Sequence, residues 1–400
     1  MKPKLLTLIP TLVTMATVLL TSDAKDPLKV YILAGQSNMQ GHAHERTIDV
    51  IGLDPATAPM LEEIKDEDGT PRIIEDVWIS SLGSADEEKT GKLTVGYGAD
   101  QRGPKLGPEL TFGIYMQKHV KEPILIIKTA WGGKSLYNDF RSPSSGPFPF
   151  REDELKQFKD KGEDIEALKA KRAKETGHYY RLMTEHIQKI LRDIKRVYPD
   201  YDPKQGYELA GFVWFQGWND MVNRGVYPNR DKPGGYDAYS TALANFIRDV
   251  RKDLSAPKMP FVIGVMGAGG PVKEYTPSKQ RYASIHQGFR DAMAAPARLP
   301  EFKGNVTAVL TEDCWDMELE SLRAEDRELQ DKVKKLKDEG KLDAKDKDKL
   351  EELRAKAFDA REREILKNGA SNAEFHYLGS AKILGLIGKA FADAVNELNK

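Results

Sequence analysis

The chain has 400 residues, of which 40% are hydrophobic and 31% are charged, a composition typical of a globular protein with a large core. Its 61 basic and 62 acidic residues give a formal net charge of −1, so no overall basic field favours nucleic acid as a partner. The single cysteine, Cys314, excludes a disulfide framework within the chain and a multi-cysteine metal site.

The first 24 residues have the pattern of a signal peptide. Lys2 and Lys4 precede an apolar run over residues 5–20, and Ser22 and Ala24 supply small residues for a cleavage site. The apolar run is shorter than the ~20 residues of a comfortable membrane span. We therefore expect export to the periplasm or the extracellular space after cleavage near Ala24. An uncleaved anchor is the alternative, and no other stable membrane span is expected.

Five apolar runs are predicted to be strands buried on both faces, as parallel sheets require. They cover residues 28–34, 123–130, 209–215, 260–266 and 306–310. Apolar residues at helical spacing between and after them predict helices, notably over 179–197 and 381–398. The alternation of strands and helices favours an α/β fold with a doubly wound parallel sheet.

Residues 317–367 do not fit this core. Leucines recur at seven-residue spacing from Leu322 to Leu336, and an apolar pattern resumes after Gly340. We interpret the segment as an antiparallel helical hairpin inserted into a main domain of residues 25–316 and 368–400. It should be dispensable for the fold. Its lysines are interleaved with acidic residues, which favours a solvated face over a nucleic-acid or membrane contact.

A candidate nucleophile follows the first predicted strand, in the block Gly35-Gln36-Ser37-Asn38-Met39. Doubly wound folds bind ligands at the carboxyl ends of their strands, and a serine there becomes a nucleophile when a base removes its proton. The amides of Gln36 and Asn38 flank the hydroxyl and are candidate substrate ligands. The alternative role for Ser37 is a helix N-cap.

Two further strand ends carry groups that could hold an oxyanion. Gly132 and Gly133 let the backbone approach a ligand and expose N–H donors, although a plain turn would use the same residues. A phosphate-binding loop is excluded because Lys128 stands where it would need glycine. Asn219, after the strand at 209–215, offers an amide donor of the same kind.

His376, shortly before the last predicted helix, is the candidate general base, because histidine titrates near neutral pH. His42 and His44 could bind substrate or metal but are more simply polar surface residues, and His286 is a weaker candidate base. There is no His-Glu-x-x-His signature and no third ligand at a useful spacing, so no metal is expected.

The blocks Gly-Gln-Ser-Asn-Met, Gly-Gly-x-Ser-Leu and Gly-x-Asn-Asp, followed by a late histidine, resemble the four blocks of the SGNH hydrolases. The first block and the Trp-x-Gln-Gly block are similar to those of the sialate O-acetylesterase and acetylxylan esterase group, carbohydrate esterase family 6. The resemblance covers residues 28–316 and 368–400. It implies a three-layer α/β/α fold of the flavodoxin-like kind and serine-dependent hydrolysis of acetyl esters on sugars, with no cofactor.

The resemblance also implies individual roles: Ser37 as nucleophile, His376 as base, and Asn219 with Gly133 or Gly132 as oxyanion donors. Gln216 is a further candidate donor or substrate ligand. It comes into question because Trp218 stands where the sugar-esterase group usually carries glutamate.

The acid of the triad is missing from its usual place. In the superfamily an aspartate precedes the histidine by three residues, and here that position is Ala373. We expect Asp316 to replace it, because an antiparallel hairpin returns close to its start and would bring Asp316 near the segment leading to His376. Glu374 and Asp313 are the alternatives, and a dyad without an acid is the last.

The sequence therefore predicts an exported serine esterase that removes O-acetyl groups from glycans of the sialate or xylan type through an acetyl-serine intermediate. The expected partner is an acetylated carbohydrate, and the sequence indicates neither the sugar nor the oligomeric state. One alternative is a deacylase for other small esters or lipids. Another is a catalytically silent glycan-binding or scaffold protein, which the missing aspartate would favour.

Overall fold

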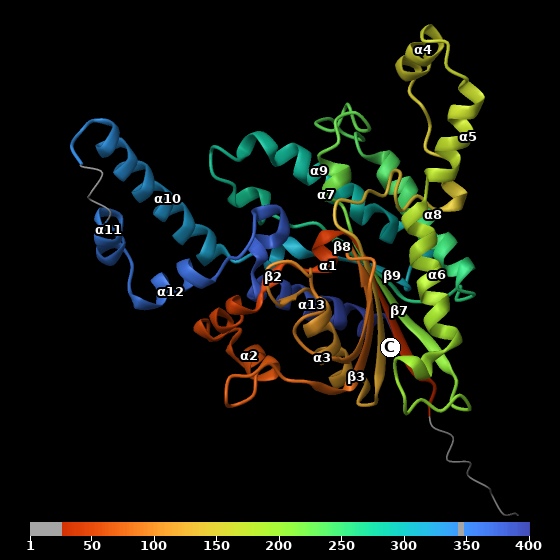
Figure 1. Ribbon diagram of the computed structural model, residues 1–400, viewed down its shortest axis with the longest axis horizontal. Coiled ribbons are helices and arrows are strands. Elements are labelled where there is room, and N and C mark those ends of the chain that lie inside the picture. Colours follow the sequence, from red (N-terminus) through yellow and green to blue (C-terminus); the bar gives the residue numbers. More distant parts are fainter. Residues whose placement is uncertain (1–25, 343–347) are drawn as a thin grey trace, which may run out of the picture.

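A seven-stranded sheet with the order β4-β3-β6-β1-β7-β8-β9 forms the centre of the molecule (Figure 1). The computed structural model describes residues 26–342 and 348–400, so the predicted signal peptide lies outside the described residues. All neighbouring strands are parallel except β3 and β4. The strands are β1 (Leu28–Gly35), β3 (Ile74–Gly83), β4 (Glu88–Leu93), β6 (Ile124–Ala130), β7 (Tyr207–Phe215), β8 (Phe261–Val265) and β9 (Val306–Leu310).

Helices cover both faces of this sheet, which confirms the predicted three-layer α/β/α fold. Alternate side chains of a strand point to opposite faces. Trp214 packs on Phe246 of α8, with ring centroids 4.3 Å apart, and Phe215 packs on Phe391 of α13 at 5.3 Å. One layer contains α3 (Glu109–Val120) and α13 (Ala381–Leu398), and the other contains α6 (His178–Arg192), α8 (Asp237–Asp253) and α9 (Ala283–Ala294).

The five predicted strands are all present, and two further strands, β3 and β4, extend one edge of the sheet. Strand β6 lies between β1 and β3, whereas in the flavodoxin order the second strand of the chain is the neighbour of the first. From β1 the chain adds β3 and β6 on one side and β7, β8 and β9 on the other. Strand β1 is therefore the topological switch point, where such sheets bind ligands.

Three strands end in register at this point. Gly35, the last residue of β1, is paired with Ala130 of β6 and with Phe215 of β7. A side chain on Gly35 has no room, because a Cβ there would lie 2.1 Å from the carbonyl oxygen of Phe215. The segments that follow the three strands therefore emerge side by side.

A buried ion pair holds the segment after β1 in place. Lys128 of β6 and Glu109 of α3 approach to 2.7 Å, and their side chains are 1% and 0% exposed. The Lys128 ammonium also donates to the carbonyl oxygens of Gln40 and Tyr97, each at 2.8 Å. Gln40 is the last residue of the short helix α1 (Ser37–Gln40). Burial lowers the pKa of Lys128, while the carboxylate of Glu109 opposes that shift.

Two helical projections stand out from the domain, on either side of the face that carries the strand ends (Figure 1). One consists of α4 (Glu152–Asp160) and α5 (Ile165–Glu175). The other is built on the predicted hairpin. No helix in residues 26–342 and 348–400 has the length and apolar character needed to cross a membrane.

The segment predicted to be an inserted hairpin contains three helices, α10 (Met317–Asp338), α11 (Lys349–Ala357) and α12 (Ala360–Asn368). The projecting part is tied together by Arg354, whose guanidinium binds both carboxylate oxygens of Asp326 at 2.6 and 2.8 Å. Its base belongs to the main core, because Leu319, Leu322 and Ile365 are buried in the same apolar cluster as the sheet.

We expect the outer part of the hairpin to be dispensable and its base to be needed. Replacing residues 324–357 with a short Gly/Ser linker should leave a soluble protein with one cooperative unfolding transition, since closing such a loop costs little. Deleting all of residues 317–367 should expose apolar core surface and cause aggregation. Thermal unfolding and gel filtration of both deletions test this. Equal behaviour of the two variants would contradict it.

The buried ion pair gives a second expectation. Lys128→Met should destabilise the fold by ~3–5 kcal/mol, because it leaves Glu109 charged and unpaired in the core. The double variant Lys128→Met/Glu109→Gln should recover a large part of that loss, since no buried charge remains. Urea unfolding of the four proteins in the cycle measures the coupling. A double variant as unstable as the sum of both single variants would contradict it.

Candidate active site

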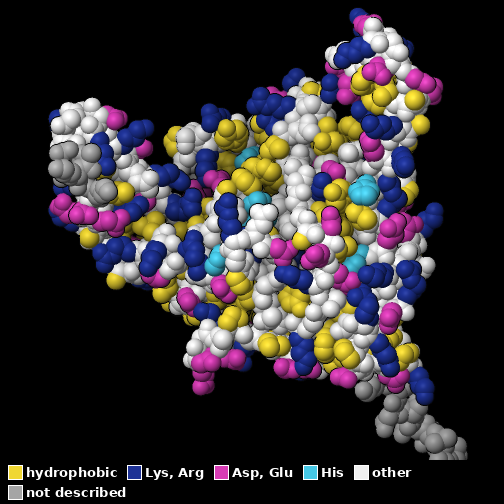
Figure 2. Space-filling model, viewed as in Figure 1, with side chains coloured by type: hydrophobic (Ala, Val, Ile, Leu, Met, Phe, Trp, Pro, Cys, Tyr) yellow, Lys and Arg dark blue, Asp and Glu magenta, His cyan; other side chains and the backbone are white. Residues whose placement is uncertain are grey.

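A cleft of about 780 Å³ opens where β1, β6 and β7 end. In the space-filling view, histidine side chains are visible on the part of the surface between the two projections (Figure 2). Five residues predicted from the sequence line this one cleft: Ser37, Gly132, Gly133, Asn219 and His376. Three strand ends and the segment before α13 thus supply these five residues.

Ser37 is the first residue of α1 and is 7% exposed. It does not act as the N-cap, which is Gln36. The N–H groups in the first turn of a helix have no partner inside the helix. The backbone of Gly132 passes close to the serine, because a Cβ built on Gly132 would lie 4.0 Å from Cβ of Ser37.

The candidate oxyanion donors differ in their availability. The N–H of Gly132 donates to Oγ of Ser84 at 2.9 Å. Gly133 adopts a positive φ of 75° and is exposed. Within residues 26–342 and 348–400, neither the N–H of Gly133 nor the amide of Asn219 makes a hydrogen bond. Both groups are therefore free to donate to a ligand in the cleft.

His376 is oriented by Asn372. Nδ1 of the histidine lies 3.0 Å from Oδ1 of Asn372, and the same oxygen accepts from the N–H of Ala373 at 2.7 Å. An amide oxygen can only accept, so Nδ1 must carry the proton. The neutral ring then has its lone pair on Nε2, which is the form required of a general base.

A second histidine lies against His376. The rings of His42 and His376 are stacked, with centroids 4.0 Å apart and planes within 1° of parallel. Burial and the charge of Lys105 lower the pKa of His376 to about 4. Burial, His376 and two lysines lower the pKa of His42 to about 3. Both rings are consequently neutral at pH 7, as close stacking requires.

The loop that carries His376 is strained. Tyr377 and Leu378, with φ of 53° and 59°, both adopt left-handed backbone conformations that non-glycine residues rarely take. The buried hydroxyl of Tyr377 compensates by accepting from the N–H of Gly267 at 2.8 Å and by bonding Oγ1 of Thr311 at 2.6 Å. The tyrosine therefore anchors the histidine loop to the ends of β8 and β9.

The prediction that Asp316 contacts His376 is not met. The Asp316 carboxylate caps α10 by accepting from the N–H of Leu319 at 3.1 Å, and it pairs with Lys382 at 3.2 Å. The free N–H groups at a helix N-terminus stabilise a carboxylate, which explains this position. The hairpin does return to the histidine segment, but Asn372 rather than Asp316 meets the ring.

The two alternative acids also lie elsewhere. Glu374 pairs with Lys279 at 3.1 Å and lines a neighbouring pocket rather than the cleft of Ser37. The side chain of Asp313 forms no hydrogen bond or ion pair with any residue that the structure describes.

The Ser37 hydroxyl makes no hydrogen bond to the ring of His42 or of His376 within the described segments. Such bonds are often long before substrate binds.

The three amides predicted to bind substrate do not line the cleft. Gln36, Asn38 and Gln216 are buried, with 1%, 4% and 1% of their surfaces exposed. The amide of Gln216 donates to Asp220 at 2.6 Å and to the carbonyl of Lys134 at 3.1 Å. Gln216 and Gln36, whose amides approach to 3.3 Å, therefore support the floor of the cleft.

Asp220 is the centre of that support. It is completely buried, and it accepts from the N–H groups of Leu136 and Tyr137 and from the hydroxyl of Tyr227, at 2.8, 3.1 and 3.0 Å. Burial raises its pKa to about 6, although these donors favour the charged form. The carboxylate fixes the turn that follows Gly132 and Gly133.

Several cleft residues were not named in the sequence analysis, among them Gln40, Ser84, Lys105 and Asn372. His42, which the sequence left as a surface residue or a ligand, also lines the cleft. For Asn372 a signal did exist, because it is a polar residue four positions before the histidine instead of three. His44 lines the cleft, and His286 lies in the neighbouring pocket. No cluster of three or more His, Cys, Asp or Glu side chains suited to a metal occurs in the part of the chain that the structure describes.

Comparisons with solved structures find nine similar chains. A protein from Arabidopsis thaliana is 15% identical, with 71% of this chain and 86% of that chain covered and a TM-score of 0.38. A carbohydrate acetylesterase from Xanthomonas citri is 14% identical over 72% of this chain and 50% of that chain, with a TM-score of 0.35. NanS is 12% identical over 71% and 78%, with a TM-score of 0.35.

The sequence matches none of the curated proteins at a significant level. The family profile described as carbohydrate esterase, sialic acid-specific acetylesterase, matches residues 27–297. This match covers more than half of the chain. It includes Ser37, Gly132, Gly133 and Asn219 and ends before His376. The chain therefore belongs to the sialic acid-specific acetylesterase family of carbohydrate esterases.

Proposed function

We propose that the protein is a serine-dependent O-acetylesterase that removes acetyl groups from sugars, and that it acts after export. The observation that supports this most directly is the sharing of one cleft by Ser37, His376 and two unoccupied hydrogen-bond donors at the switch point of the sheet. The predicted signal peptide supports the location.

In the first half-reaction Oγ of Ser37 attacks the acetyl carbonyl carbon while Nε2 of His376 accepts the serine proton. Negative charge develops on the carbonyl oxygen, where the N–H of Gly133 and the amide of Asn219 can donate hydrogen bonds. Collapse of this intermediate breaks the ester bond. The sugar oxygen leaves with the proton from His376, and the acetyl group stays on the serine.

In the second half-reaction a water molecule attacks the acetyl-enzyme. His376 takes a proton from that water, and the same donors hold the oxyanion. Acetate leaves, and the proton returns to Ser37. No redox step or cofactor is required.

Asn372 would do only part of the work of a triad acid. It holds the tautomer of His376 that leaves Nε2 unprotonated, which a triad aspartate also does. It carries no charge, so it stabilises the imidazolium of the transition state less than a carboxylate would. Together with the lowered pKa of His376, this describes a weak base that remains neutral in moderately acidic solution.

The charges of the cleft favour an acidic sugar. Arg46, Arg102 and Lys105 line it, and Asp100 is the only carboxylate among its described lining residues. A carboxylated sugar such as sialate is complementary to this surface, whereas a neutral xylan is not. We therefore favour sialate over xylan as the substrate type. Rates on acetylated sialic acid and on acetylated xylo-oligosaccharides compare the two.

The nucleophile can be tested directly. A serine-directed phosphonate should add one adduct per chain, on Ser37, and Ser37→Ala should lose at least ~10³-fold in turnover of p-nitrophenyl acetate. Ser278→Ala, a change outside the cleft, is the matched control and should retain full activity. An adduct on another serine, or an active Ser37→Ala protein, would refute the proposed nucleophile. Folding is checked by thermal unfolding.

The pH dependence tests the base and its partner. Initial rates should show an acidic limb of kcat/KM near pH 4, because His376 must be neutral to accept a proton. Asn372→Asp should raise the pKa of His376 and move this limb to higher pH by about one unit or more. Asn372→Leu should lower kcat by ~10²-fold or more, since the ring loses its orientation.

Asp316→Asn is the matched control for this experiment. It should lower thermal stability through loss of the helix cap and the Lys382 pair, while the acidic limb stays in place. If Asp316→Asn moved the limb and Asn372→Asp did not, the assignment of the histidine partner would be wrong.

A further inference from the structure

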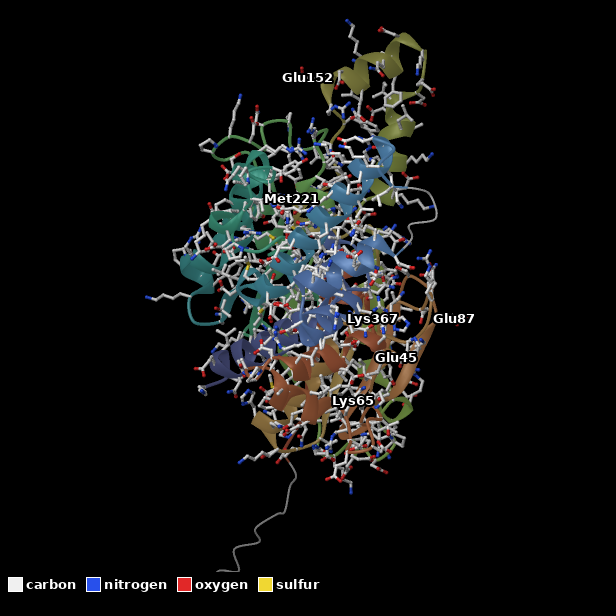
Figure 3. The ribbon with its side chains drawn as sticks, turned by 90° about the vertical axis from the view of Figure 1, so that its left-hand side faces the viewer. Glu45, Lys65, Glu87, Glu152, Met221 and Lys367 are labelled. Carbon is white, nitrogen blue, oxygen red and sulfur yellow. The ribbon has the colours of Figure 1, made fainter. Side chains whose placement is uncertain are left out.

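A second pocket of about 400 Å³ lies beside the catalytic cleft. Trp218 and Phe375 line both cavities, and their rings are 5.6 Å apart, so this pair forms the wall between them. The other side of the pocket is formed by α9 and the turn that follows α7 (Trp218–Met221). Figure 3 labels Met221, which lines the pocket, below the projection that carries Glu152.

The pocket gathers exposed apolar surface. Val222, Tyr282 and Phe375 are 44%, 39% and 39% exposed, and they are three of the seven most exposed large apolar side chains in the described residues. Single exposed apolar side chains are common on proteins, but a group of them lining a concave site marks a place where a ligand binds.

The pocket also offers specific hydrogen-bonding groups. The hydroxyl of Tyr275 accepts from Arg290 at 3.3 Å, so it donates its own proton to Nδ1 of His286 at 2.7 Å. Burial lowers the pKa of His286 to about 4, and the neutral ring must then carry its proton on Nε2. Glu374 adds a carboxylate acceptor to the lining, and Arg230 and Lys279 add donors.

We infer that this pocket is a second sugar subsite, which binds the ring linked to the acetylated sugar in the cleft. The inference rests on the proposed function, because the cleft must hold an acetylated sugar. A pyranose ring has an apolar C–H face and a rim of hydroxyl groups. Aromatic faces such as those of Tyr282 and Phe375 suit the first, and His286 and Glu374 suit the second.

The shared wall explains why two linked rings would fit. A ligand that crosses the edge of Trp218 and Phe375 places one ring near Ser37 and the next ring in the pocket. A fatty acyl chain is a poorer occupant, because it would remove water from Arg230 and from the Lys279–Glu374 ion pair without offering a hydrogen bond in return. The preferred substrate is therefore an acetylated oligosaccharide rather than a free acetylated monosaccharide.

The test compares an acetylated disaccharide with the matching acetylated monosaccharide and with p-nitrophenyl acetate. The wild-type protein should show at least ~10-fold higher kcat/KM for the disaccharide. Tyr282→Ala should remove this advantage and leave the other two substrates unchanged. Tyr207→Ala alters a side chain that is 42% exposed at the opposite end of β7, and it should change nothing.

Binding measured without turnover separates this inference from the proposed function. Calorimetry of Ser37→Ala protein with the deacetylated disaccharide should show binding that Tyr282→Ala, in the same background, weakens ~10-fold. Failure to hydrolyse any acetyl ester would refute the proposed function alone. Equal kcat/KM for both sugars, or no binding of the disaccharide, would refute the subsite. If p-nitrophenyl octanoate were hydrolysed faster than p-nitrophenyl acetate, and Tyr282→Ala abolished this gain, the pocket would bind an acyl chain and the sugar subsite would be refuted.

Discussion

The pairing of Gly35 with both Ala130 and Phe215 fixes where the residues of the candidate site lie. Because three parallel strands stop at one level, the residues that follow them leave the sheet together. Ser37, the glycine pair and Asn219 each come from a different one of these three segments. A shift of one residue in the pairing of β1 with either neighbour would turn its side chains to the other face. The close approach at Gly35, which leaves no space for a Cβ, helps to specify the register.

Two buried charged side chains, those of Lys128 and Asp220, hold the segments that follow the strands in fixed positions. Lys128 of β6 donates a hydrogen bond to the last residue of α1, and Asp220 of α7 accepts hydrogen bonds from the turn after β6. Lys128 donates to one backbone carbonyl in each of two segments, and Asp220 accepts from two backbone N–H groups of one turn. Buried ions add little net stability, but their hydrogen bonds allow few arrangements of the loops they bind. The loops that line the cleft are consequently held in position by hydrogen bonds to these buried side chains.

The sequence contained most of this arrangement, because buried parallel strands are continuous apolar runs and the site lies where they end. It did not reveal β3, whose polar and apolar residues are mixed, or β4, a charged edge strand. The sequence also did not predict that Asn372 is the hydrogen-bond partner of His376. The predicted hairpin geometry pointed to Asp316, but a carboxylate at the start of a helix accepts hydrogen bonds from the N–H groups of that helix instead. Gln36 and Gln216 do lie at the strand ends, as predicted. Only packing decides whether the amide of such a residue faces the cleft or lies beneath it.

The burial of neutral histidines has a consequence for survival in acid. Burial lowers the pKa of His42 to about 3 and the pKa of His186, His286 and His376 to about 4. In an unfolded chain these rings would titrate near ~6.5. Between about pH 6.5 and pH 4 the unfolded chain therefore binds more protons than the folded one, and the free energy of unfolding decreases as the pH falls. The burial that keeps the ring of His376 neutral in mild acid thus also makes the fold less stable as protons are added over the same pH range.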